Sequence, residues 1–151
     1  MELKFSLDEL KLLESHFKLN TDFELKNNEP IEISAYIGVS YKRENRIVQV
    51  IVSVNSHGEK QPFVFDTKMA GTFGFSKLPG KEQLDRIVHI NCAAIIFPYV
   101  REAIADLTRR AGLPPFHLGP LNFVALYQKN RKPLAEKEEV QVRNNTRKES
   151  P

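Results

Sequence analysis

The side chains of this chain that could take part in covalent or metal chemistry are one cysteine and four histidines. Cys92 follows His89 by three residues, a spacing that places both side chains on one face of a helix. A thiol beside an imidazole can act as a nucleophile with its base. Cys92, however, lies in an apolar run over residues 90–97, and burial raises the pKa of a thiol and makes it unreactive. We therefore expect a structural Cys92, with a cysteine-dependent enzyme as a minor alternative.

The other histidines, His16, His57 and His117, have no spacing to one another or to Cys92 that predicts a metal site. The sequence has no phosphate-binding loop and no dinucleotide fingerprint. A single cysteine also provides no disulfide framework. The sequence thus predicts no catalytic residue, no metal and no cofactor.

The segment that contains Cys92 is predicted to be a long helix. The helix begins at Lys81, and its apolar positions are Leu84, Ile87, Val88 and Ile95. Pro98 lacks the N–H that would bond to Ala94, so we expect a kink or a break there. Gly112 is a natural residue for the end of the helix.

Upstream of this helix, apolar and polar residues alternate as they do in half-buried strands. Strands are expected over residues 16–26, 31–40, 47–54 and 61–75, joined by polar turns such as residues 42–45. Gly71 and Gly74 indicate a bulge or a close backbone approach in the last of them. The predicted fold class is therefore α+β, with a four-stranded antiparallel β-sheet followed by a long kinked helix and a second C-terminal helix.

The first residues of the chain support two interpretations. Ser6 followed by Glu9 is a capping-box pattern, which predicts a short helix over residues 7–14. The alternation from Leu13 to Leu19 favours a strand instead.

Charge divides the chain into a body and a tail. Residues 1–127 carry 15 basic and 15 acidic side chains, and residues 128–151 supply the whole net charge of +3. A neutral body predicts no nucleic-acid surface, and a nucleic-acid binder that uses its basic tail is a minor alternative. We expect one domain over residues 1–131 and a flexible charged tail over residues 132–151, where apolar residues are too few to fold.

Targeting signals are not evident in the sequence. No unbroken apolar run approaches the ~20 residues of a membrane helix. The first residues alternate charged and apolar side chains and lack the core of a signal peptide. We expect a cytoplasmic protein without direct membrane insertion.

The loop between the two predicted helices is both apolar and rich in proline, and a second helix is predicted over residues 121–129. Prolines hold exposed apolar side chains in place at low entropic cost, which suits clients of varied sequence. An extended client segment can also pair with a sheet edge through main-chain bonds. For Phe123 we favour a core position, although it shares this segment. The candidate client-binding residues are Leu113, Phe116, Leu118, Leu121, Phe123 and Tyr127.

The runs NCAAIIFPYVREAI and GLPPFHLGPLNFVALY resemble the helix, loop and helix signature of the SecB family of bacterial export chaperones. The resemblance implies α+β subunits that assemble as a homotetramer, a dimer of dimers. It also implies that unfolded preproteins are held in apolar grooves without nucleotide and are passed to the SecA ATPase. The positions that match the family's SecA-docking surface are Asn20, Glu24, Val64 and Asp66.

Three features depart from the family pattern. Asn20 stands where the family has an acidic residue, and the tail is basic where the family's is acidic. The connection between Phe23 and Ile31 is short, whereas the family has a long tryptophan-bearing crossover loop. Divergent SecB-like chaperones serve toxin–antitoxin systems, so a chaperone dedicated to one antitoxin-type client is the alternative function.

Overall fold

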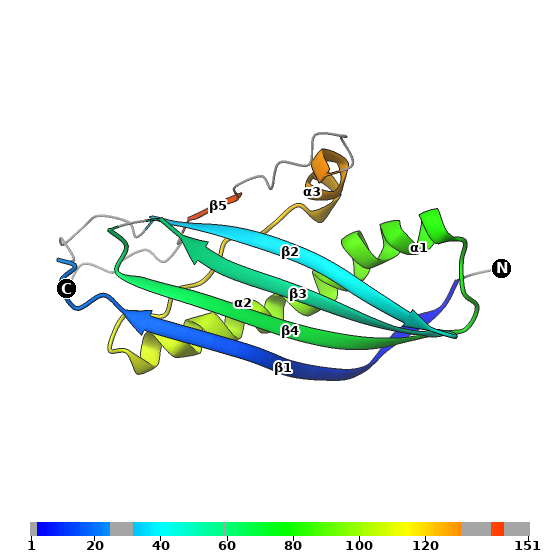
Figure 1. Ribbon diagram of the computed structural model, residues 1–151, viewed down its shortest axis with the longest axis horizontal. Coiled ribbons are helices and arrows are strands. Elements are labelled where there is room, and N and C mark those ends of the chain that lie inside the picture. Colours follow the sequence, from blue (N-terminus) through cyan, green and yellow to red (C-terminus); the bar gives the residue numbers. More distant parts are fainter. Residues whose placement is uncertain (1–2, 25–31, 59, 131–139, 144–151) are drawn as a thin grey trace.

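A computed structural model describes residues 3–24, 32–58, 60–130 and 140–143 of the chain. An antiparallel sheet lies in front of the helices in the view of Figure 1. The elements in chain order are β1 (Phe5–Leu19), β2 (Glu32–Glu44), β3 (Ile47–His57), β4 (Phe63–Phe75), α1 (Lys81–Ile87), the π-helical turn η1 (Val88–Cys92), α2 (Ala93–Arg110), α3 (Phe123–Asn130) and β5 (Val140–Arg143).

The sheet has the strand order β1-β4-β3-β2-β5, and every neighbouring pair is antiparallel. The fold class and the four-stranded antiparallel arrangement are confirmed, although the first predicted strand coincides with β1 only at residues 16–19. The turn expected over residues 42–45 begins later, because Lys42, Arg43 and Glu44 continue β2 and pair with β3. The chain reverses at Asn45, whose φ of 55° lies in the left-handed region that asparagine tolerates.

The helix predicted over residues 7–14 is wrong, because these residues lie in the middle of β1. The hydroxyl of Ser6 does not cap a helix but donates a hydrogen bond of 2.8 Å to Asp8. The strand predicted over residues 16–26 ends at Leu19, where a turn begins at Asn20. The side-chain oxygen of Asn20 accepts a bond of 3.2 Å from the backbone of Asp22, and this closes the turn. The last two residues of that predicted strand lie outside the described residues.

One face of the sheet is the core face, and α2 packs on it. Val48, Val50, Val52 and Val54 of β3 alternate with less buried residues and are fully buried. Gly71 of β4 lies directly under Ile96 of α2, and a Cβ at position 71 would lie 2.8 Å from the Ile96 Cδ1 atom. The close approach predicted at Gly71 is present, although the approaching atoms belong to the Ile96 side chain and not to another backbone. The bulges lie in the partner strand, in β1 between Leu7 and Glu9 and between Leu12 and Glu14.

Pro98 lies inside α2, so the helix does not break there, and a kink at Pro98 stays a prediction. The irregular turn lies earlier, at η1, where one extra residue is inserted into the helical repeat. Because of this insertion Ile96 occupies the core position predicted for Ile95, and Ile95 is 39% exposed. Gly112 ends α2 with a φ of 81°, as predicted.

Lys81–Arg110 is long and apolar enough to cross a bilayer by length and composition alone. It contains no long unbroken apolar run, because charged residues are spread along it. In its most apolar window 44% of the residues are buried within the chain. It packs on the sheet as the core helix of a folded domain does.

Four residues of the segment predicted to be a flexible tail form β5. This strand pairs antiparallel with the beginning of β2, with Val140 opposite Ala35 and Arg143 opposite Glu32. Its backbone is therefore part of the sheet. The rest of residues 132–151 lies outside the described residues, and its flexibility stays a prediction.

Candidate functional site

Cys92 lies at the end of η1 and is fully buried. Burial raises the pKa of its thiol to about 12. The thiol therefore stays protonated at neutral pH, whereas a nucleophile or a metal ligand needs the thiolate. Within the described ranges, no group of three His, Cys, Asp or Glu residues is placed to hold a metal ion.

His89 belongs to a different cluster, centred on Asp85 of α1. The carboxylate of Asp85 accepts hydrogen bonds from Tyr41 of β2 at 3.3 Å and from Tyr127 of α3 at 3.0 Å. The His89 ring packs 5.5 Å from the Tyr127 ring, measured between centroids. Burial, and next the negative charge of Asp85, raise the pKa of Tyr41. The cluster joins the sheet, the first helix and α3, and so fixes where α3 lies.

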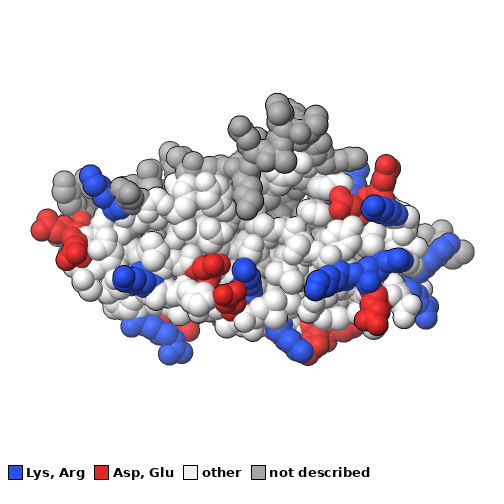
Figure 2. Space-filling model, in the orientation of Figure 1, with Lys and Arg blue, Asp and Glu red and all other residues white. Residues whose placement is uncertain are grey.

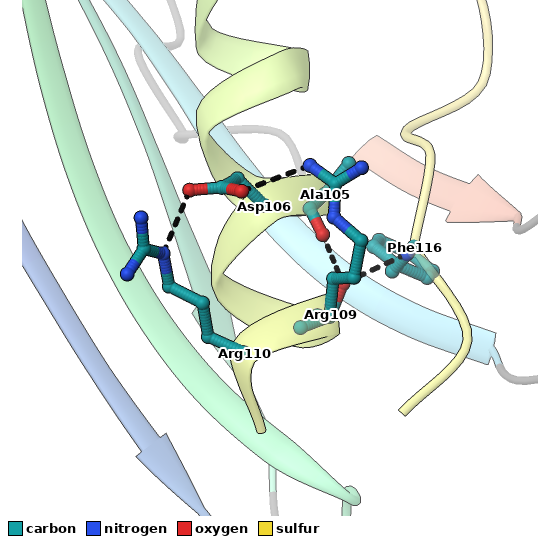
Figure 3. A network of polar contacts seen from close by, with 6 residues as sticks. Ala105, Asp106, Arg109, Arg110 and Phe116 are labelled. Carbon is teal, nitrogen blue, oxygen red and sulfur yellow. Dashed lines mark hydrogen bonds and ion pairs between the residues drawn. The ribbon is translucent and has the colours of Figure 1, made fainter. Parts of the chain in front are cut away.

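The loop after α2 is held by Thr108, which is fully buried. The Thr108 hydroxyl donates to the Ala105 carbonyl at 2.8 Å and accepts the backbone N–H of Phe116 at 2.9 Å. Figure 3 shows Phe116 beside the last turns of α2, with Asp106 between Arg109 and Arg110. Hydrogen bonds from Arg110 and then from Arg109 lower the pKa of Asp106. The loop is thus attached to the helix from within the core.

The predicted client-binding residues are either buried or half-buried, and none of them is exposed. Phe116 and Leu118 are fully buried, and the Phe116 ring meets the Phe63 ring edge to face at 5.5 Å. The expectation that the loop exposes these two side chains is wrong, because the bond from Thr108 turns the loop toward the sheet. Leu113 and Leu121 are half-buried. Phe123 and Tyr127 form the buried side of α3, and the Phe123 ring contacts Phe97, as favoured for a core residue.

An open groove of about 540 Å³ lies between the helix and the start of α3. Its lining is mainly apolar, with one amide side chain. Two of its residues, Leu121 and Phe123, belong to the predicted set, and the insertion at η1 hid the helix residues from the sequence pattern. The lining residues are Ile90, Ala94, Pro120, Leu121, Asn122, Phe123 and Val124.

The predicted SecA-docking residues lie near one end of the β1–β4 pair. Val64 and Asp66 are on the face of β4 opposite to the helices, and Glu24 is exposed after the end of β1. The Asn20 side chain stabilises the local fold, because its amide donates a hydrogen bond of 3.0 Å to the backbone carbonyl of Gln61. A shallow hollow of about 420 Å³ adjoins Val64 and Asp66, and Lys18 also lines it. The surface is therefore of mixed charge.

Charges are also mixed over the rest of this open face. Figure 2 shows lysine and arginine side chains between aspartate and glutamate side chains, with wide areas of other residues. Glu14 of β1 is an example, since it lies 2.8 Å from His16 and 3.4 Å from Lys68. These contacts, first the one with His16, lower the pKa of Glu14. Among the described residues of this face, basic and acidic side chains alternate and form no continuous basic stripe.

Taken together, these elements define an antiparallel β-sheet with a helix layer and an apolar groove beside α3. The family model described as preprotein translocase subunit SecB matches residues 14–133. The chain belongs to the SecB family, as its sequence signature indicated.

Curated relatives and a solved structure agree with this family. The protein-export protein SecB of Paraburkholderia phymatum is 44% identical over 80 residues, which are 53% of this chain and 51% of the relative. That of Burkholderia vietnamiensis is 49% identical over 70 residues, 46% of this chain and 43% of the relative. The matched stretch thus spans about half the length of these relatives. The fold is similar to that of the Mycobacterium tuberculosis Rv1957 SecB-like chaperone, which was solved in complex with a ChAD peptide from the Rv1956 HigA1 antitoxin. The TM-score is 0.67 and the sequence identity is 19%. The similarity covers 78% of this chain and 90% of that one.

Proposed function

We propose that this chain is the subunit of an ATP-independent chaperone that holds unfolded or precursor polypeptides and keeps them competent for export through SecA in the cytoplasm. The groove between the helix and α3 carries the proposal. It is apolar, open to solvent and lined in part by Val124, which is 41% exposed. Exposed apolar surface of this kind marks binding sites for other chains.

The groove suits a client that has no fixed sequence. Apolar side chains of an unfolded chain gain about 25 cal/mol for each Å² removed from water, whatever their order in the sequence. Phe123 and Tyr127 contribute to this groove through the buried side of α3. They hold α3 against the long helix and so keep the wall of the groove in place. Phe116 and Leu118 hold the preceding loop in the core, the half-buried Leu121 lines the groove, and the half-buried Leu113 lies after the end of α2. No nucleotide is needed for binding of this kind.

The client role is tested by comparing two exposed apolar residues. Val124→Ser changes the groove, and Ile47→Ser makes the same kind of change at a residue that is 54% exposed on β3, away from the groove. In an aggregation-suppression assay with an unfolded client, we expect Val124→Ser to require several-fold more protein and Ile47→Ser to act as the wild type. Equal behaviour of the two variants would exclude the groove, and no suppression by the wild type would exclude the chaperone.

A homotetramer built as a dimer of dimers is proposed as the working assembly. Ile95 and Tyr99 lie on the uncovered side of α2 and are 39% and 45% exposed. A second subunit would remove this apolar side from water. Native mass spectrometry should give four times the chain mass of 17.3 kDa, and a monomer at micromolar concentration would refute the assembly.

The SecA hand-over is proposed on the residues Asn20, Glu24, Val64 and Asp66. Glu24→Lys reverses a charge on this exposed surface, so it should weaken a SecA pull-down at low salt and spare client holding. Asp8→Lys, a charge reversal at the other end of β1, is the matched control. Full SecA binding by Glu24→Lys at low salt would argue against the docking site.

A chaperone dedicated to one antitoxin-type client is the second candidate. The fold similarity to a SecB-like chaperone solved with an antitoxin peptide favours it, as does Asn20 in place of an acidic residue. Titration of the protein with several unrelated unfolded chains distinguishes the two functions. Similar affinities for all of them support the general chaperone, and one strongly preferred client supports the dedicated one.

A further inference from the structure

The last described strand, β5, covers only the beginning of the β2 edge. Its four residues pair with Glu32–Ala35 of β2. Along residues 36–44, no strand of the described chain pairs with this edge of β2. Figure 1 shows β5 as a short strand beside one end of the much longer β2. Within the described part of the chain, most of the β2 edge therefore has backbone N–H and C=O groups that pair with no strand.

The uncovered part of β2 has the properties of a strand acceptor. Ile37, Val39 and Tyr41 point toward the helix side and are half-buried, whereas Gly38 and Ser40 on the other side are exposed. A strand added here would gain main-chain hydrogen bonds without regard to its sequence. Its alternate side chains would also cover the half-buried apolar row. β5 shows that this edge accepts an added strand.

We propose that β5 is an intrachain occupant of this strand-accepting edge, and that an extended segment of an unfolded client displaces it when the client binds along β2. The inference rests on the proposed chaperone function. Both segments need the same backbone groups of Glu32–Ala35, so a client that pairs with the full length of β2 cannot bind while β5 is in place.

The length of the chain between α3 and β5 determines how strongly β5 competes with a client segment for the β2 edge. Nine residues, 131–139, connect α3 to β5. A short connection of this kind gives a tethered segment an effective concentration on the order of millimolar. If β5 occupied the edge about 90% of the time, the measured client affinity would be about tenfold below that of the free edge. β5 would then exclude weak, short segments and yield to long unfolded chains.

A replacement at constant length tests the proposal. Residues 140–143 are changed to Gly-Ser-Gly-Ser, and the matched control carries the same change at residues 144–147. The measurement is the Kd of a fluorescently labelled, reduced and carboxymethylated polypeptide that cannot refold. We expect the first variant to bind about three- to tenfold more tightly than the wild type, and the control to bind as the wild type does. Unchanged or weaker binding by a folded 140–143 variant would overturn the proposal.

Hydrogen exchange in the wild-type protein gives a second test that needs no variant. With saturating client, the amides of Val140–Arg143 should lose protection and those of residues 36–44 should gain it. Client binding that leaves the protection of Val140–Arg143 unchanged would also overturn the proposal. If neither the wild type nor the 140–143 variant binds the polypeptide, the chaperone function fails, and the displacement of β5 fails with it.

Discussion

Residues 113–118 and residues 120–127 are neighbours in sequence and similarly apolar, yet the fold uses them in different ways. The first segment turns inward, so that Phe116 and Leu118 complete the core. The second forms the groove wall and α3, a helix with one buried side and one exposed side. The difference arises from one buried hydroxyl, because Thr108 binds the backbone of the first segment and has no bond to the second. Apolar composition alone therefore does not distinguish core from binding surface.

The largest expected effect is on the buried segment. Phe116→Ala removes a fully buried ring that contacts Phe63, so the free energy of unfolding should fall by about 3–5 kcal/mol. Urea denaturation followed by circular dichroism measures the loss. A loss below ~1 kcal/mol would mean that the loop leaves the core easily, and the contrast between the two segments would disappear.

A smaller loss of stability is expected when the hydroxyl of Thr108, which binds the first segment, is removed. Thr108→Val leaves the N–H of Phe116 without its acceptor and should cost about 1–3 kcal/mol of stability. Thr67→Val is the matched control, because the Thr67 hydroxyl is equally buried and has no hydrogen-bond partner among the described residues. The control should be neutral or slightly stabilising. Equal destabilisation by both changes would show that the cost arises from packing and not from the hydrogen bond.

The hydrogen bond that attaches α3 to Asp85 should contribute less to stability than the Thr108 hydroxyl does. Tyr127→Phe removes the hydrogen bond to Asp85 and leaves the ring in place, so we expect a loss of about 0.5–1.5 kcal/mol. Hydrogen exchange should become faster in α3 before it does in α2. Tyr41→Phe, which removes the other bond to Asp85, is the control that should leave exchange in α3 nearly unchanged. Equal acceleration in both variants would mean that Asp85 acts on the whole helix layer.

The smallest effect on stability belongs to the exposed side of α3. Val124→Ser should change the free energy of unfolding by no more than about 0.5 kcal/mol, as is usual for a surface substitution. Its effect on client holding should be several-fold, as proposed above. Together with Phe116→Ala it separates stability from binding within one short stretch. A large loss of stability in Val124→Ser would place α3 wholly in the core.

Regular alternation in the sequence was sufficient to predict β2, β3 and β4, and the signature around Cys92 was sufficient to predict the family. The first half of β1 was missed because Ser6 and Glu9 carry a local helix signal, whereas the strand depends on pairing with β4, more than 50 residues away. β5 was missed although Val140–Arg143 alternate apolar and polar residues, because four residues within a charged segment are too short a pattern to distinguish a strand from a tail. Its pairing with β2, a distant segment of the chain, is not visible in a single sequence.

The site was predicted only in part, for reasons that lie in the helix and the loop. The insertion at η1 moves Ile96 into the core and leaves Ile95 exposed, a shift of one residue that no simple period predicts. Leu121 and Phe123, which line the candidate groove, were selected because they follow a proline-rich loop. Phe116 was predicted to belong to the same exposed surface, but it is buried. The hydrogen bond that turns it inward joins the Phe116 backbone to the side chain of Thr108, eight positions earlier, and the sequence pattern does not show such a bond.

The close approach of Gly71 to Ile96 links two positions that evolution would otherwise vary independently. A Cβ at position 71 would crowd the Ile96 side chain and lie 3.1 Å from the Leu7 Cδ1 atom, so it fits best where the residue at position 96 is smaller. Substitutions at the two positions should therefore occur as a pair, with the total volume nearly constant, and sequences that carry one change alone should be rare. Such covariation among sequences of the family would be evidence, independent of any measurement on this chain, that the helix and the sheet are closely packed at these two positions.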